Sequence, residues 1–135
     1  IVFQDVSGTQ IGSIARTTNN VAYNTSSDYR LKENVSGLSD GITRIKQLKP
    51  SRFNFISEPD ITMDGFIAHE VSSIVPEAIN GEKDAVITQA MLDADTLEGT
   101  IGDPIYQGID QSKLVPLLVA AVQELITKVE TLEAA

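Results

Sequence analysis

The sequence predicts an α+β fold, in which a small globular body of short strands and helices carries a long C-terminal coiled-coil-like helix and follows a short β-rich stem piece. Three observations lead to this prediction. The first 24 residues are rich in glycine, asparagine and β-branched residues. The middle of the chain mixes short strand-like and helix-like apolar patterns. The last segment repeats apolar residues in heptads.

The N-terminal 24 residues predict short strands and turns. Ile1, Phe3, Ile11 and Ile14 alternate with stretches of Gly, Ser, Thr and Asn, which are typical of turns. Such a piece buries little by itself, so we expect it to be the end of a longer β-rich stem built from several chains.

Apolar residues at helical spacing begin the middle region, at Leu38, Ile42, Ile45 and Leu48. They predict a short helix. Ser36 or Ser39 is its expected cap, and Pro50 is expected to end it.

The next segments predict strands at residues 52–55, 65–68 and 85–88, with a helical turn over residues 70–74 that Pro76 stops. Residues 80–108 include a long acidic, glycine-containing loop. A loop of this length is either functional or disordered.

The C-terminal pattern predicts a helix over about residues 112–134, with Pro116 near its start. Its heptad seam has valine at a and leucine at d: Val115, Leu118, Val122, Leu125, Val129 and Leu132. This pairing favours two strands. Leu114 and Ala121 at g, with Val119 and Ile126 at e, widen the apolar face. A trimer or packing of the helix on its own domain would use that width, and the sequence leaves the choice open.

Composition excludes several functions. The chain has no cysteine and one histidine, so disulfides, thiolate chemistry and a multi-histidine metal site within one copy are excluded. With 41% hydrophobic residues but only seven Phe or Tyr and no Trp, a core must be mostly aliphatic. We expect no cofactor and no metal. Asp93, Asp95, Glu98 and Asp103 miss the spacing of a calcium loop, and His69 is expected to pack at a strand-to-helix junction.

The net charge of −9 is uneven, because residues 57–135 carry fifteen acidic and three basic side chains. A strongly acidic chain repels nucleic acid and anionic membranes, so neither is expected as a partner. The acidic half is either a solvated surface or a surface that attracts the more basic first half.

One short segment holds the residue types of a serine peptidase. Ser27 offers a hydroxyl, Lys32 an amine, Asp28 a carboxylate and Arg30 a guanidinium. A neutral lysine can take a serine's proton when burial or a positive charge lowers its pKa. On a helix, side chains five residues apart point about 140° apart. A working pair therefore needs a bend, or a lysine from a neighbouring chain.

Three blocks in order resemble one family: SSDYRLKENV, then GFIAHEVSSIVPEAI, then KLVPLLVAAVQELITKVETLE. They resemble the intramolecular chaperone auto-processing domain, which ends bacteriophage tailspikes, endosialidases, neck appendages and L-shaped tail fibres and also occurs in the myelin regulatory factor. The resemblance covers roughly residues 25–135. It implies a stem end over residues 1–26 and a self-cleaving chaperone domain over residues 27–135.

The resemblance also implies roles for single residues. Ser27 would be the nucleophile and Lys32 its base, a Ser–Lys dyad that cuts the Ser26–Ser27 bond once. Asp28 and Arg30 would complete the motif, with Asp28 orienting Arg30 or Lys32. The neighbouring Ser26 hydroxyl leaves a small ambiguity of register.

The implied partners are two further copies in a homotrimer and the preceding fibre stem of the same polypeptide. The implied location is the host cell cytoplasm during assembly, with the mature fibre in the virion tail, where it serves host attachment, and the chaperone domain released. The competing hypothesis is a structural trimerisation or receptor-binding tip that stays attached to the fibre. A hydrolase acting in trans lacks support, since no G-x-S-x-G motif occurs.

Overall fold

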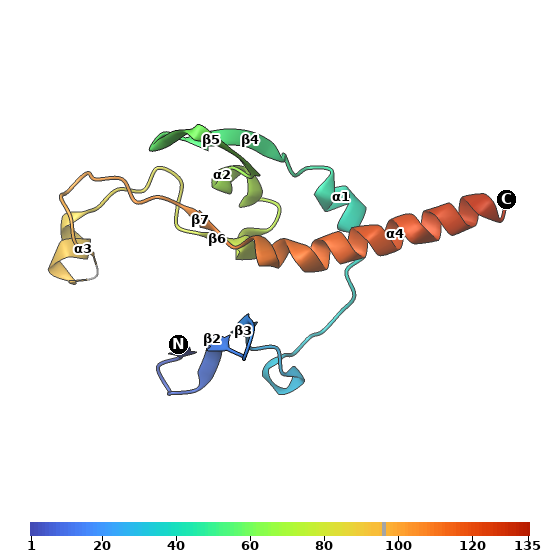
Figure 1. Cartoon of the computed structure of the whole chain (residues 1–135), viewed down its shortest axis with the longest axis horizontal. Coiled ribbons are helices and arrows are strands. Elements are labelled where there is room, and N and C mark those ends of the chain that lie inside the picture. Colours follow the sequence, from blue (N-terminus) through green and yellow to red (C-terminus); the bar gives the residue numbers. More distant parts are fainter. Residues whose placement is uncertain (96) are drawn as a thin grey trace. The chain divides into compact units, whose positions relative to one another are not determined.

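The computed structural model describes residues 1–95 and 97–135, and it confirms an α+β fold with separate sheets and a long C-terminal helix (Figure 1). The chain divides into two compact units, Ile1–Gly37 and Leu38–Ala135. The predicted domain boundary lies earlier, between residues 26 and 27, and stays a prediction. None of the helices among the described residues is long and apolar enough to cross a membrane.

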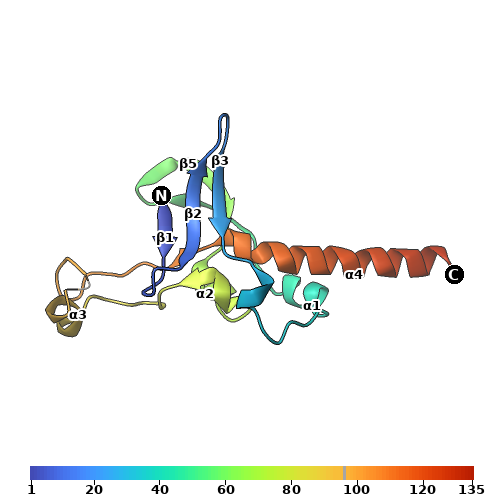
Figure 2. The ribbon, with the colours of Figure 1, turned by 90° about the horizontal axis from the view of Figure 1, so that it is seen from below.

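The first unit is a three-stranded antiparallel sheet, ordered β1 (Val2–Gln4), β2 (Gln10–Arg16) and β3 (Val21–Thr25), which Figure 2 shows side by side. Its turns hold themselves together locally. Asp5 accepts hydrogen bonds from the backbone of Ser7 and Thr9, and Gly8 takes the left-handed conformation at φ 83°. No side chain in residues 1–37, all of them described, is buried. This agrees with the expectation that the segment buries little alone.

The second unit begins with α1 (Gly41–Ile45), followed by the hairpin of β4 (Ser51–Phe55) and β5 (Glu58–Gly65). The predicted strand at residues 52–55 is confirmed. The one predicted at 65–68 is wrong, because β5 ends at Gly65 and α2 (Ala68–Val71) already begins at Ala68. Pro76 opens the 3-10 turn η2 (Pro76–Ala78), where its missing N–H costs nothing.

Residues 79–109 leave the body and return to it. β6 (Ile79–Asn80) pairs with β7 (Gly108–Ile109), which closes the base of this excursion, and α3 (Gln89–Asp93) lies near its far end (Figure 1). The predicted strand at residues 85–88 forms only an isolated bridge between Val86 and Pro104. Thr96, within the predicted loop, lies outside the described residues.

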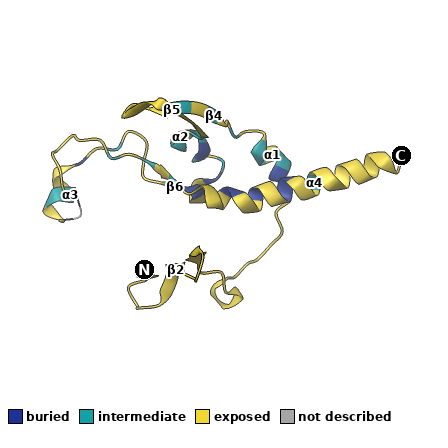
Figure 3. Ribbon diagram, in the orientation of Figure 1, coloured by how far each residue is buried: buried dark blue, intermediate teal, exposed yellow. Residues whose placement is uncertain are grey.

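The hydrophobic core is aliphatic, as the composition predicted. Its buried members are Val71, Val75, Ala78, Leu114 and Leu117, which come from α2, the residues after it, and the start of the last helix. That last helix is α4 (Val115–Glu133), preceded by the 3-10 turn η3 (Gln111–Leu114). Pro116 lies in its first turn, as predicted. Figure 3 shows buried residues in the first half of α4 and exposed ones in the second.

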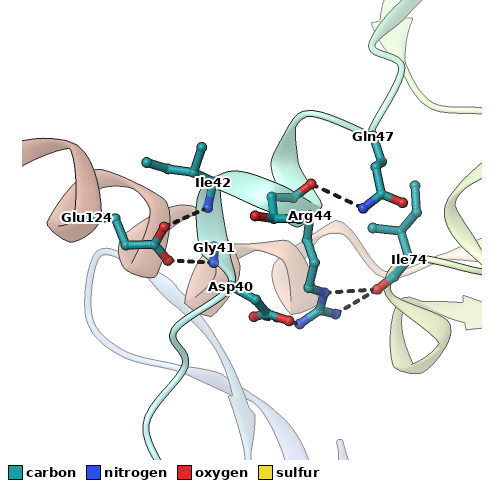
Figure 4. A network of polar contacts seen from close by, with 8 residues as sticks. Asp40, Gly41, Ile42, Arg44, Gln47, Ile74 and Glu124 are labelled. Carbon is teal, nitrogen blue, oxygen red and sulfur yellow. Dashed lines mark hydrogen bonds and ion pairs between the residues drawn. The ribbon is translucent and has the colours of Figure 1, made fainter. Parts of the chain in front are cut away.

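The start of α1 is fixed by α4 and not by its own sequence (Figure 4). Gly41 and Ile42 donate their backbone N–H groups to the Glu124 carboxylate, at 2.6 and 3.2 Å. The prediction that Ser36 or Ser39 caps this helix is therefore wrong, because a carboxylate 83 residues further along supplies the acceptor. Arg44 adds a second tie by donating to the carbonyl of Ile74.

Gly41 allows this close approach. A Cβ at this position would lie 2.5 Å from the backbone nitrogen of Ala121. We expect Gly41→Ala to lower the free energy of unfolding by about 1–3 kcal/mol, because α1 and α4 would have to separate. Urea denaturation measures this. Gly108→Ala is the matched control, since nothing lies within 4 Å of its added Cβ. Equal stability of the two variants would contradict the close packing.

Candidate functional site

A single 3-10 turn organises the predicted motif. The turn η1 (Tyr29–Leu31) is held by backbone bonds from Leu31 to Asp28 and from Lys32 to Tyr29, each 3.1 Å. Asp28 and Lys32 flank the turn in extended conformations, with ψ of 135° and 142°. The chain therefore runs extended, turns once, and runs extended again.

This turn brings the two predicted catalytic side chains together. Lys32 Nζ donates a hydrogen bond to Ser27 Oγ at 2.7 Å. An α-helix would hold these side chains apart, and the expected bend is supplied by the 3-10 turn. The contact forms within one chain, so a lysine from a neighbouring copy is not required for it. Whether the pair carries out catalysis stays a prediction.

Asp28 and Arg30 form a second pair beside the first. Arg30 Nε and Nη2 donate to the two oxygens of the Asp28 carboxylate at 2.9 and 2.8 Å, and the backbone N–H of Arg30 donates to the same carboxylate at 2.9 Å. The Arg30 side chain is the main reason that the pKa of Asp28 lies below its usual value, with its backbone N–H and the charge of Lys32 adding to the effect. Asp28 is thus ionised. Its carboxylate both caps the turn and forms an ion pair with the Arg30 side chain.

The two neighbouring serines have different surroundings. Ser26 continues the sheet, because its backbone N–H donates to the carbonyl of Ile11 at 3.0 Å and its hydroxyl donates to the carbonyl of Gln10 at 3.1 Å. Ser27 instead meets the lysine. The peptide bond between them thus joins the end of the sheet to the turn, and the surroundings favour Ser27 over Ser26 as the nucleophile.

The whole motif from Ser26 to Lys32 is exposed in the single chain. A lysine acts as a base only through its neutral amine, which burial or a neighbouring positive charge favours. The geometry of the pair is therefore present in one chain, while the dry surroundings that a lysine base needs are not.

Helix α4 presents two different faces. Leu117, Ala120 and Ala121 are buried against the body. The predicted seam lies about 120° around the helix, at 100° per residue, and its six residues are 49–74% exposed. The e-position residues Val119 and Ile126 are also about half exposed, whereas Leu114 and Ala121 at g are buried. Packing on its own domain thus uses a face beside the seam and leaves the seam open.

A groove of about 1090 Å³ opens on the second unit, between the β4–β5 hairpin and the residues before η3. Phe55, Met63, Ile67 and Tyr106 are among its lining residues, and each keeps at least 39% of its surface exposed. No sequence pattern indicated this groove, because its apolar lining residues are spread from Phe53 to Ile109 without a common period. It adds to the apolar surface that a single copy leaves in water.

The remaining candidates have ordinary surroundings. His69 is exposed in α2, and its backbone carbonyl accepts a bond from the Ser72 hydroxyl. Asp93 accepts from Gln89, and Asp103 accepts from the backbone of Thr100. Over residues 1–95 and 97–135, no three His, Asp or Glu side chains form a group that could hold a metal ion.

The fold and site thus define an α+β chain with a Ser–Lys contact in an exposed turn and an unpaired apolar helix face. Residues 27–80 match the model of the peptidase family described as the chaperone of endosialidase. This match confirms the predicted resemblance for that segment and supports a chaperone role. It begins at Ser27 and spans the first two resemblance blocks almost completely, while α4 lies outside it. No curated protein matches the chain.

Proposed function

We propose that the chain is a C-terminal intramolecular chaperone of a phage tail fibre or tailspike, which joins three copies in register and then releases itself by cutting its own Ser26–Ser27 bond. The 2.7 Å contact between Lys32 Nζ and Ser27 Oγ carries this proposal. It lies at the start of the segment that matches the peptidase family, and the family description names a chaperone.

The reaction uses the position of Ser27 just after the bond that breaks. Lys32 Nζ takes the hydroxyl proton while Ser27 Oγ attacks the carbonyl carbon of Ser26. The bond from that carbon to the Ser27 nitrogen then breaks, and the amine leaves with the proton. Water hydrolyses the resulting ester, which leaves a carboxylate on Ser26 and a free amine on Ser27.

Assembly into a trimer would supply the dry surroundings that the Lys32 amine lacks in one chain. The exposed a, d and e positions of α4 offer an apolar stripe wider than a two-stranded seam buries, which favours three helices. We infer that the assembled chains also cover the turn, which would remove water from the Lys32 amine and favour its neutral form. Trimerisation therefore comes first and cleavage second.

Cleavage after trimerisation would make the assembled fibre hard to reverse. Holding three chains together at one end lowers the entropic cost of bringing distant strands into register. Losing the chaperone afterwards prevents simple reversal, so the stability of the fibre becomes kinetic. The second candidate function is a structural trimerisation or receptor-binding tip that stays attached to the fibre. The full exposure of the Ser27–Lys32 motif in one chain favours it, because an exposed lysine is a poor base.

The serine pair allows a matched test of cleavage. We expect the chain to yield a fragment that begins at Ser27, and Ser27→Ala to remove it, because the nucleophile is lost. Lys32→Arg should slow cleavage by at least about 100-fold, since a guanidinium does not act as a base. Ser26→Ala is the control and should still cleave, because Ser26 uses its hydroxyl only to bond Gln10. Intact mass spectrometry measures all four proteins. An intact wild-type trimer, or cleavage that survives Ser27→Ala, would contradict the proposal.

The exposed seam allows a test of assembly. We expect Leu118→Asp with Leu125→Asp to give a monomer, because both side chains are about half exposed in one copy and would be buried between copies. In the uncut Ser27→Ala background, sedimentation equilibrium should give three times the chain mass when the seam is unchanged. Gln123→Asp, on the same helix but outside the seam, should remain a trimer. A dimer when the seam is unchanged, or a trimer that survives the double substitution, would contradict the predicted seam.

A further inference from the structure

We propose that the Asp28–Arg30 ion pair is a positioning device for Lys32, in which Arg30 occupies the carboxylate that would otherwise pair with the lysine ammonium. This inference rests on the proposed autoproteolysis and assigns Arg30 a role as a charge shield. Neither side chain touches the scissile bond in the proposed reaction, so both act through Lys32.

The oxygen of residue 28 caps the turn, and here that oxygen belongs to a carboxylate. The Asp28 carboxylate caps η1 through the backbone N–H of Arg30 at 2.9 Å, and this turn sets the spacing that lets Lys32 meet Ser27. The same carboxylate is then a negative charge between the two catalytic residues in the sequence. The carboxylate that caps the turn therefore also favours the protonated form of Lys32, which the proposed reaction needs in its neutral form.

A nearby negative charge stabilises the protonated form of an amine, and a nearby positive charge stabilises the neutral form. The influence of Lys32 on Asp28 is present but is the smallest of those that lower the pKa of Asp28, while the Arg30 side chain is the largest. The strongest electrostatic interaction of the Asp28 carboxylate is thus the one with the Arg30 side chain, and not the one with Lys32. The same pair raises the pKa of Arg30, so the shield stays charged.

Arginine suits this role better than lysine. Its planar fork bonds both carboxylate oxygens at once, through Nε to Oδ1 and Nη2 to Oδ2, and it does not lose its proton at any working pH. The next charged residue, Glu33, forms no ion pair with Lys32 among the residues that the structure describes. Asp28 is the carboxylate whose pKa the charge of Lys32 helps to lower, so its charge is the one that the proposed shield balances.

The test compares the pH dependence of cleavage in the full chain. The proposed reaction, which needs a neutral amine as its base, is expected to become faster as the pH rises. We expect Arg30→Gln to move this rise upward by about one pH unit and to slow cleavage about tenfold near neutral pH, because Asp28 then faces Lys32 alone. Arg30→Lys keeps a positive charge and should restore most of the wild-type profile. Arg16→Gln, in β2 of the same unit, is the matched control and should change nothing.

A double substitution separates shielding from simple folding effects. Asp28→Asn keeps an oxygen that can cap the turn and removes the charge. In that background, we expect Arg30→Gln to cause no further shift of the pH profile. The shield is overturned if Arg30→Gln leaves the profile unmoved, if it shifts the profile equally with Asn at position 28, or if Arg30→Lys behaves like Arg30→Gln. Sedimentation confirms that each variant still assembles.

Failure of this inference differs from failure of the proposed function. If the wild-type chain releases the fragment beginning at Ser27 and the Arg30→Gln profile stays unmoved, autoproteolysis stands and the shield falls. If the wild type releases no such fragment, the proposed function falls and takes the shield with it.

Discussion

The capped turn at residues 28–32 is the constraint on which the account of this molecule depends. Asp28 accepts the backbone N–H of Arg30, the turn closes, and Lys32 Nζ reaches Ser27 Oγ at 2.7 Å. Without the turn, an extended chain or a helix would place these side chains apart. The sheet fixes Ser26 on one side through Ile11 and Gln10, so the bond proposed to break is held between a sheet and a turn.

Helix α4 has two faces with different surroundings, one buried in its own domain and one exposed to water. One face buries Leu117, Ala120 and Ala121 in its own domain, and Glu124, further along the same face, caps α1. The seam beside it stays exposed. A single copy is therefore folded in its second unit and still leaves apolar surface in water, which is the condition under which self-association is favourable. The exposed amine and the exposed seam are both consistent with the proposed trimer, in which they would be covered.

Features with a local cause could be predicted from the sequence, and features with a distant cause could not. The heptads and Pro116 predicted α4, and alternation predicted β4. Strand β5 was missed because its exposed residues include few apolar ones and its pairing with β4 defines it. The Glu124 cap joins residues 83 positions apart and has no local signal. Ser27 and Lys32 were selected through resemblance, while the turn that joins them depends on the Asp28 side chain, whose capping role was not foreseen.

The dependence of the cleavage rate on chain concentration tests most directly the claim that one copy holds the pair but not its working surroundings. Refolded chain is diluted across the range in which it passes from monomer to trimer, and the fragment beginning at Ser27 is followed by mass spectrometry. The account predicts that the rate per chain rises with the fraction of trimer and becomes negligible in the monomer. A rate per chain that stays the same from monomer to trimer would contradict it, because the exposed pair would then be active without assembly.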